Sequence, residues 1–176
     1  MTANLATIIA PLIYAEARKL LDAHKAAGRD VFSVSTSGQE MVGPIAAMLG
    51  ASRVIATRMA RSGGRYTGEI EFCAYGEGKA ARIRELAAER EYALGACFAY
   101  SDSMTDLPML EAVGHPHAVN PDRQLRRASA ARDWPVLVFP QGRAPQRRPA
   151  PRGREAGRGA GHLAKRAAQT CEQQLQ

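Results

Sequence analysis

The stretch of the chain whose residues are best suited to carry out chemistry is AYSDSMTDLPML, residues 99–110. Asp102 and Asp106 lie four residues apart there, just after a short apolar run. Carboxylates at the end of a buried strand suit Mg²⁺, a hard cation that prefers oxygen ligands. Helix capping by aspartate is the alternative, and it explains one carboxylate more easily than two. The stretch therefore indicates either a metal site or a polar turn that starts a helix.

A second polar cluster is SVSTSG, residues 33–38, in which Ser35 ends a β-prone run and Gly38 opens a turn into a helix. A hydroxyl group, free backbone N–H groups and a helix N-terminus together form a site for an anion. An ordinary Ser/Thr helix cap is the alternative.

A third signal is Lys79, which stands at the start of a predicted helix. A cation at a helix N-terminus opposes the helix dipole. This mismatch favours an anionic ligand or a carboxylate partner for the lysine, and a solvated surface lysine is the alternative.

The elements that must position these residues alternate along the chain. Apolar periodicity predicts helices and β-prone runs predict strands, and Gly63-Gly64 between two strand-like runs predicts a β-hairpin over residues 58–72. The predicted helices cover residues 12–27, 39–50, 78–91, 104–113 and 122–132, and the predicted strands cover 30–35, 53–57, 96–101, 116–119 and 135–139. This alternation predicts an α/β fold, a doubly wound, Rossmann-like parallel sheet with helices on both faces.

The charge of the chain is concentrated in its last residues. The 176 residues carry a net charge of +7, and residues 140–176, with eight basic and two acidic side chains, contribute 8 − 2 = +6 of it. This Arg/Pro/Gly-rich segment has no apolar period and is predicted to be a disordered tail. Nucleic-acid binding through it is an alternative function that we do not expect, because interleaved aromatic side chains are missing. No stretch approaches a membrane span, and the N-terminal residues do not resemble a signal peptide, so we expect a cytoplasmic protein.

The order of the polar clusters resembles the haloacid dehalogenase superfamily, and most closely its phosphoserine-phosphatase-like branch, the subfamily IB hydrolases. SVSTSGQEM is similar to the second motif of that branch, and TRMARSGGRYTGEIE to the hairpin that follows. GKAARIREL resembles the third motif, and AYSDSMTDLPMLEAVGHPHAVNPD the fourth. The resemblance covers about residues 10–139 and implies phosphoryl transfer that depends on Mg²⁺.

The resemblance also implies roles for individual residues. Ser35 would donate a hydrogen bond to the transferring phosphoryl group, and backbone N–H groups around Thr36 and Ser37 would add further donors. Lys79 would neutralise the charge of the phosphoryl group and of the nucleophile. In phosphoryl transfer, such positioning and charge stabilisation supply most of the catalysis.

The two aspartates complete the implied site. Asp102 would ligate Mg²⁺. Asp106 would support the metal site and orient Lys79 or a metal-bound water. The substrate would be a small phosphorylated compound.

One motif of the family is missing from the printed sequence. The first motif, Asp-x-Asp-x-Thr, supplies the nucleophile that forms an aspartyl-phosphate, and no Asp-x-Asp occurs in this chain. We therefore expect residues 1–11 to be a remnant of a cap or linker helix, and residues 12–139 to be a truncated core that lacks its first, central strand. Such a core is expected to be inactive alone and to need another polypeptide to complete its sheet. A non-catalytic module that binds phosphate or metal is the alternative function.

Overall fold

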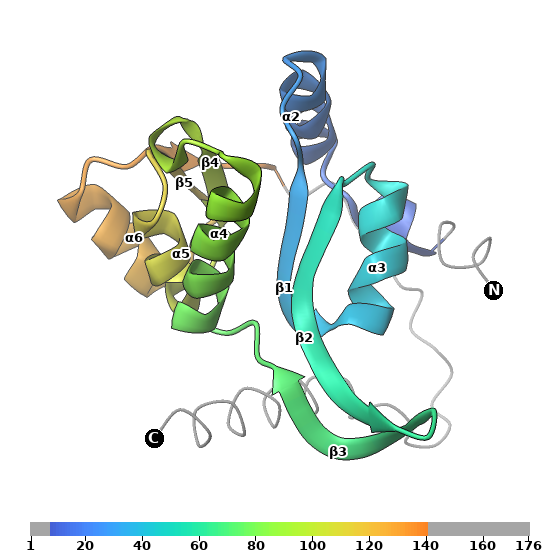
Figure 1. The fold of residues 1–176 in the computed structure, drawn as a ribbon. Helices are drawn as coiled ribbons and strands as arrows, with labels where there is room; N and C mark the ends of the chain where they lie inside the picture. Colours follow the sequence, from blue (N-terminus) through green and yellow to red (C-terminus); the bar gives the residue numbers. More distant parts are fainter. Residues whose placement is uncertain (1–7, 141–176) are drawn as a thin grey trace, which may run out of the picture. The chain divides into compact units, whose positions relative to one another are not determined.

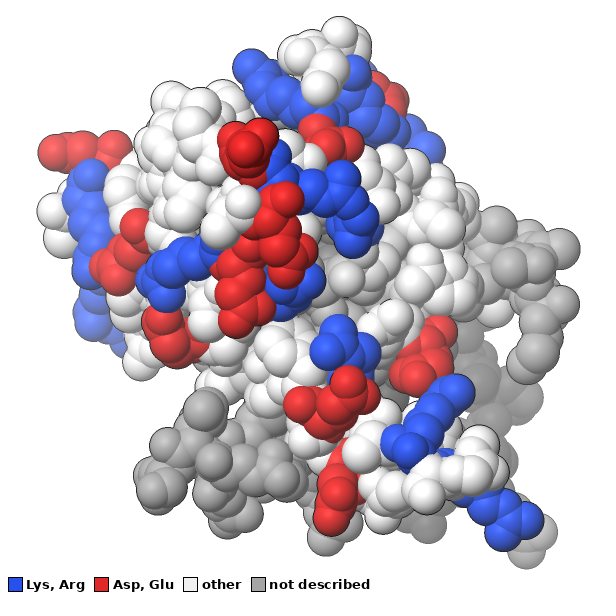
Figure 2. Space-filling model, in the orientation of Figure 1, with Lys and Arg blue, Asp and Glu red and all other residues white. Residues whose placement is uncertain are grey.

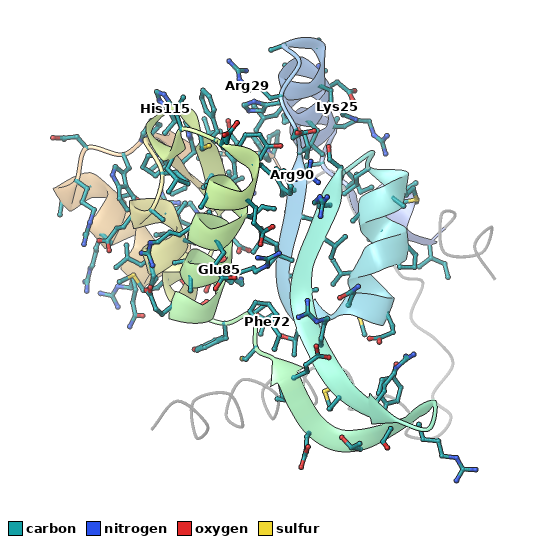
Figure 3. The ribbon with its side chains drawn as sticks, in the orientation of Figure 1. Lys25, Arg29, Phe72, Glu85, Arg90 and His115 are labelled. Carbon is teal, nitrogen blue, oxygen red and sulfur yellow. The ribbon has the colours of Figure 1, made fainter. Side chains whose placement is uncertain are left out.

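The computed structural model describes residues 8–140, which divide at Phe72 into two units. Each unit contains a sheet of three strands (Figure 1). Phe72, labelled in Figure 3, ends the last strand of the first sheet. The predicted remnant at residues 1–11 lies partly outside the described residues, and so does the predicted tail at residues 140–176, of which only the first residue is described.

The first unit is a parallel strand pair extended by a hairpin. Its strands are β1 (Phe32–Gly38), β2 (Arg53–Ser62) and β3 (Arg65–Phe72), in the order β1-β2-β3, with β1 and β2 parallel. Helix α3 (Gln39–Met48) connects β1 to β2 and packs on both. The apolar side chains buried in this unit are Val42, Ala46, Ile55 and Ala56.

The predicted hairpin is present, and its turn has the expected conformation. Gly63 and Gly64 connect β2 to β3 with φ angles of 56° and 79°. Two consecutive residues in this left-handed region are the reason for the Gly-Gly pair, because a side chain would strain the backbone there.

Two helices of the first unit differ in detail from the prediction. The predicted helix 12–27 is a 3₁₀ turn, η1 (Ala10–Leu12), followed by α2 (Ala15–Ala26), and Gly28 with a φ of 72° follows its end. Pro44 lies inside the predicted helix 39–50, as the sixth residue of α3. It therefore removes one intrahelical N–H donor from the second turn, where the carbonyl of Glu40 loses its usual partner.

The second unit carries a parallel sheet with the strand order β4-β5-β6. The strands are β4 (Phe98–Ser101), β5 (His115–Val119) and β6 (Val136–Leu137). The helices are α4 (Glu77–Arg90), α5 (Leu107–Glu111) and α6 (Arg123–Ala131), with 3₁₀ turns η2 (Leu94–Ala96) and η3 (Met104–Asp106). Figure 1 shows α4 and α5 side by side, and α5 also packs on β4 and β5.

The core of the second unit is built largely from alanines, which let α4 lie close to its neighbours. Its buried apolar residues are Ala74, Ala80, Leu86, Ala87, Ala99, Met109, Leu110, Ala118 and Leu125. Gly114 marks another close approach, because a Cβ atom there would lie 1.9 Å from the carbonyl oxygen of Gly95.

The α/β fold class is confirmed, with parallel pairing of β1 with β2 and of β4, β5 and β6 with one another. Instead of a single incomplete sheet, residues 8–140 form two sheets. Within these residues β1 pairs only with β2, and β4 only with β5. Each of these two strands therefore keeps one edge without a β partner in the described part of the chain.

The surface of the described residues mixes both signs of charge. Figure 2 shows acidic and basic side chains interleaved on the face in view. No helix within residues 8–140 has the length and apolar character needed to cross a lipid bilayer.

Candidate functional site

A buried ion pair joins two of the predicted site residues in the second unit. The ammonium group of Lys79 lies 2.6 Å from Oδ1 of Asp106, and the two side chains are only 5% and 12% exposed. By contrast, Arg82 on the same helix pairs with Glu85 and Glu89 at the surface (Glu85 is labelled in Figure 3). A lysine is rarely buried unless it is paired, so Lys79 is not the solvated surface lysine that the sequence left open.

The start of α4 is shaped to bring Lys79 inward. Gly76 caps the helix with a φ of 50°, and Lys79 is the third residue after it. A Cβ atom on Gly78 would lie 2.4 Å from the carbonyl oxygen of Cys73, so only glycine allows this close packing. The GEGK sequence therefore lets the first turn of α4 lie against the preceding loop.

Asp106 uses both of its carboxylate oxygens within the protein. Oδ1 accepts from Lys79, and Oδ2 accepts from the hydroxyl of Ser101 at 2.7 Å. The same hydroxyl oxygen accepts from the backbone N–H of Ser103 at 3.2 Å. A buried charge is tolerable when it is paired and its remaining lone pairs are satisfied, and this network meets both conditions. It fixes the ammonium group of Lys79 in position.

Asp102 differs from Asp106 in its surroundings. It follows β4 directly and is exposed, and no residue in the described range 8–140 forms a hydrogen bond or ion pair with its carboxylate. No group of three or more His, Cys, Asp or Glu side chains that could hold a metal exists among these residues. Mg²⁺ in phosphoryl-transfer sites is commonly held by one or two carboxylates together with waters and substrate phosphates. The free carboxylate of Asp102 fits one such position.

The predicted phosphate loop lies in the first unit. The ladder between β1 and β2 is regular up to Ser35 opposite Ala56 and resumes with Gly38 opposite Thr57, so Thr36 and Ser37 stand outside the regular pairing. The hydroxyl oxygen of Ser35 accepts from the N–H of Ser37 at 3.2 Å.

The loop is also tied to β2. The buried hydroxyl of Thr57 donates to the carbonyl of Thr36 at 2.7 Å. This loop and the Lys79 network belong to different units, so joint action of Ser35 with Lys79 stays a prediction.

Three residues that no sequence pattern indicated, Ser101, Thr57 and Asp122, form hydrogen bonds to these clusters. Ser101 and Thr57 support Asp106 and Thr36, as described above. Asp122 accepts from the backbone N–H groups of Leu125 at 2.7 Å and Met104 at 2.8 Å. These backbone hydrogen bonds hold the pKa of the Asp122 carboxyl below its usual value. The position of Asp122 directly before an amphipathic helix predicts a helix N-cap, but it does not predict the hydrogen bond to Met104.

An ammonium group suits a phosphate and a carboxylate suits Mg²⁺, so the Lys79–Asp106 pair and the exposed Asp102 favour a protein that handles phosphate groups. Comparison with known proteins agrees, because residues 2–111 match the model of the haloacid dehalogenase-like hydrolases. The chain belongs to this family.

One curated relative and two solved structures show what the chain is similar to. A Mycobacterium tuberculosis protein named "Probable phosphatase" is 61% identical over 132 residues, 75% of this chain and 46% of the relative. A protein of unknown function from Bordetella pertussis aligns with a TM-score of 0.71 and 35% identity, over 77% of this chain and 63% of that one. A substrate-bound phosphoserine phosphatase aligns with a TM-score of 0.55 and 21% identity, over 70% of this chain and 56% of the other, and shows a shared fold.

The family match confirms the predicted relationship to the haloacid dehalogenases, and a Mycobacterium tuberculosis relative named phosphoserine phosphatase, 36% identical over 75% of this chain and 43% of the relative, supports the predicted branch. The chain spans about half the length of these curated relatives.

Proposed function

We propose that this chain is the phosphate- and metal-binding part of a Mg²⁺-dependent phosphomonoester hydrolase of the haloacid dehalogenase type. The observation that supports this most directly is the buried Lys79–Asp106 pair with Ser101 as its second anchor. An ammonium group held at 2.6 Å by a buried carboxylate is suited to stabilising a phosphoryl group, because it needs no rearrangement when charge develops.

Each residue of the proposed site has a separate task. Lys79 offsets the negative charge of the phosphoryl oxygens, and Asp106 orients Lys79, since both oxygens of Asp106 already have protein partners. Asp102 offers its exposed carboxylate to the metal. Bound Mg²⁺ would neutralise phosphoryl charge and fix the orientation of the substrate. Ser35 and the backbone around Thr36 and Ser37 would donate hydrogen bonds to the phosphoryl oxygens.

The nucleophile of the reaction is not supplied by this sequence, because no Asp-x-Asp occurs in it. We therefore propose that the chain alone does not form an aspartyl-phosphate. Another polypeptide segment with Asp-x-Asp-x-Thr at the end of an apolar strand would complete the site. The edge of β4 that lacks a β partner within residues 8–140 is consistent with the addition of such a strand to the sheet that carries Asp102. The substrate would be a small phosphomonoester in the cytoplasm.

A second candidate function rests on the same missing motif. Without a nucleophile, the site would bind phosphate or Mg²⁺ without turnover. In that case Ser35 and Lys79 would bind the phosphate, and Asp102 would bind the metal.

Calorimetry and a turnover assay with the full chain test the binding site that both candidates share. We expect Mg²⁺ and inorganic phosphate to bind, with Mg²⁺ binding lost in Asp102→Asn and kept in Asp133→Asn, an aspartate of the same unit outside the site. We expect no hydrolysis of p-nitrophenyl phosphate by the chain alone. Hydrolysis that requires Mg²⁺ and disappears in Asp102→Asn would disprove the proposed inactivity, and absence of both binding signals would disprove the site.

A further inference from the structure

We infer that Asp122 is a positioning residue for Asp102: it fixes the loop that presents the proposed metal-binding carboxylate. The inference rests on the proposed function, because it assigns a purpose to the same site. Asp122 lies twenty residues from Asp102 in the sequence, between β5 and α6. In the structure the two residues are in direct contact through their backbones.

Three of the hydrogen bonds that Asp122 forms bear on this role. Its backbone N–H donates to the carbonyl of Asp102 at 2.8 Å. Its Oδ2 accepts from the N–H of Met104 at 2.8 Å, and its Oδ1 accepts from the N–H of Leu125 at 2.7 Å. Two of these bonds hold the loop on both sides of Ser103, and only the third belongs to α6.

The two carboxylate oxygens therefore serve different elements. Capping of α6 requires one acceptor for the N–H of Leu125, and serine, threonine or asparagine would provide it as well as aspartate. The bond to Met104 requires a second acceptor on a side chain long enough to reach the loop. An aspartate satisfies both requirements together. Helix capping alone would need only one of its two oxygens.

Asp122 itself is held firmly by the residues before it. Pro121 is buried and restricts the backbone, and Asn120 has a φ of 44°. The side chain of Asn120 donates to the carbonyl of Phe139 and accepts from its N–H, both at 3.0 Å. The Asn-Pro-Asp sequence thus links the loop after β4 to the end of the chain segment that contains β6.

This support matters because the side chain of Asp102 is not held by any other side chain within residues 8–140. Its carboxylate is exposed and has no hydrogen-bonding or ionic partner among residues 8–140, so the side chain depends on its backbone for its place. The inner side of the same loop is fixed by Ser101 with Asp106, and the outer side by Asp122. A carboxylate that is already in position loses less conformational freedom when it binds a metal.

Two substitutions separate loop positioning from helix capping. Asp122→Ser keeps a cap for α6 and is too short to reach Met104. Asp122→Asn keeps one oxygen for Leu125, and its amide group is a donor that cannot accept from Met104. Asp122→Ala removes both functions and serves as the control for loss of the cap.

The first readout is amide hydrogen exchange by NMR in the metal-free full chain. We expect exchange at Met104 to rise about three- to tenfold in Asp122→Ser and Asp122→Asn, while Leu125 stays protected. In Asp122→Ala, both amides should exchange faster. Equal change at Met104 and Leu125 in all three variants, or no change at Met104, would overturn the inference.

The second readout is Mg²⁺ affinity by calorimetry. We expect Asp122→Ser and Asp122→Asn to bind Mg²⁺ about three- to tenfold more weakly than wild type. Unchanged affinity in both variants would overturn the positioning of Asp102. If wild type itself does not bind Mg²⁺, the proposed function fails, and the exchange experiment still decides whether Asp122 fixes the loop.

Discussion

Replacing Lys79 with methionine tests the energetics of the proposed site. The substitution keeps an unbranched, apolar side chain of similar length and removes the ammonium group 2.6 Å from Asp106. Asp106 then keeps the hydrogen bond from Ser101 and loses its countercharge. Its side chain is only 12% exposed, so water does little to replace the lost ammonium group. Removing one partner of a buried pair costs about 3–5 kcal/mol, because an uncompensated charge is left inside the protein.

A surface pair on the same helix provides a matched control. Arg84 and Glu77 lie 2.5 Å apart with side chains 49% and 63% exposed. Arg84→Met should lower the free energy of unfolding by about 0–1 kcal/mol, as is usual for exposed ion pairs. The double variant Lys79→Met/Asp106→Asn should recover part of the loss of Lys79→Met, because no unpaired charge remains.

Urea unfolding followed by circular dichroism at pH 7 gives the free energy of unfolding of each variant. We expect Lys79→Met to be less stable than Arg84→Met by at least about 2 kcal/mol, the gap between the two ranges above. If Lys79→Met lowers the free energy of unfolding no more than Arg84→Met does, the Lys79–Asp106 pair is not buried, and the reasoning is wrong.

Three further predictions concern the packing and chemistry around the site. Ser129 is fully buried and its hydroxyl has no hydrogen-bond partner among residues 8–140. Ser129→Ala should therefore raise the free energy of unfolding in urea by up to about 1 kcal/mol. A lower free energy of unfolding in this variant would show that the hydroxyl has a partner. Gly114→Ala should lower the melting temperature sharply, because its Cβ would lie 1.9 Å from the carbonyl oxygen of Gly95. Gly43→Ala, inside α3 with open space around it, should raise the melting temperature, and a reversed order of the two variants would contradict the packing. Burial raises the pKa of the Cys97 thiol, so less thiolate is present near neutral pH. Alkylation of Cys97, followed by mass spectrometry of its peptide, should therefore be slower in the native chain than in urea. Equal rates would contradict the burial.

The elements of the fold were predictable because their signals are local. The periodicity of residues 78–91 and the Gly63-Gly64 pair depend only on neighbouring residues, and both the helix and the hairpin are present. Element ends were less accurate: α2 begins at Ala15, after a separate 3₁₀ turn. The arrangement of the strands as two sheets depends on which strands are available to pair, which local patterns do not contain.

The candidate site was predictable in part. The helix dipole indicated that Lys79 needs an anionic ligand or a carboxylate, and the structure pairs it with a carboxylate. That Asp106, 27 residues away, is this carboxylate was implied by the family resemblance and not by spacing, and the structure contains this pair. The second acceptor role of Asp122 could not be predicted, because a helix cap and a cap that also holds a distant loop have the same sequence.

Reconstitution of hydrolysis shows whether this chain supplies the phosphate- and metal-binding part of a phosphatase whose nucleophile comes from another segment. The full chain is mixed with a peptide that carries an apolar strand followed by Asp-x-Asp-x-Thr, and hydrolysis of p-nitrophenyl phosphate is measured with and without Mg²⁺. We expect activity only in the mixture with Mg²⁺, and loss of activity when the first aspartate of the peptide is replaced by asparagine or when Asp102→Asn is introduced into the chain. Equal activity of the chain alone, or a mixture in which the peptide binds and no hydrolysis occurs, would contradict this expectation.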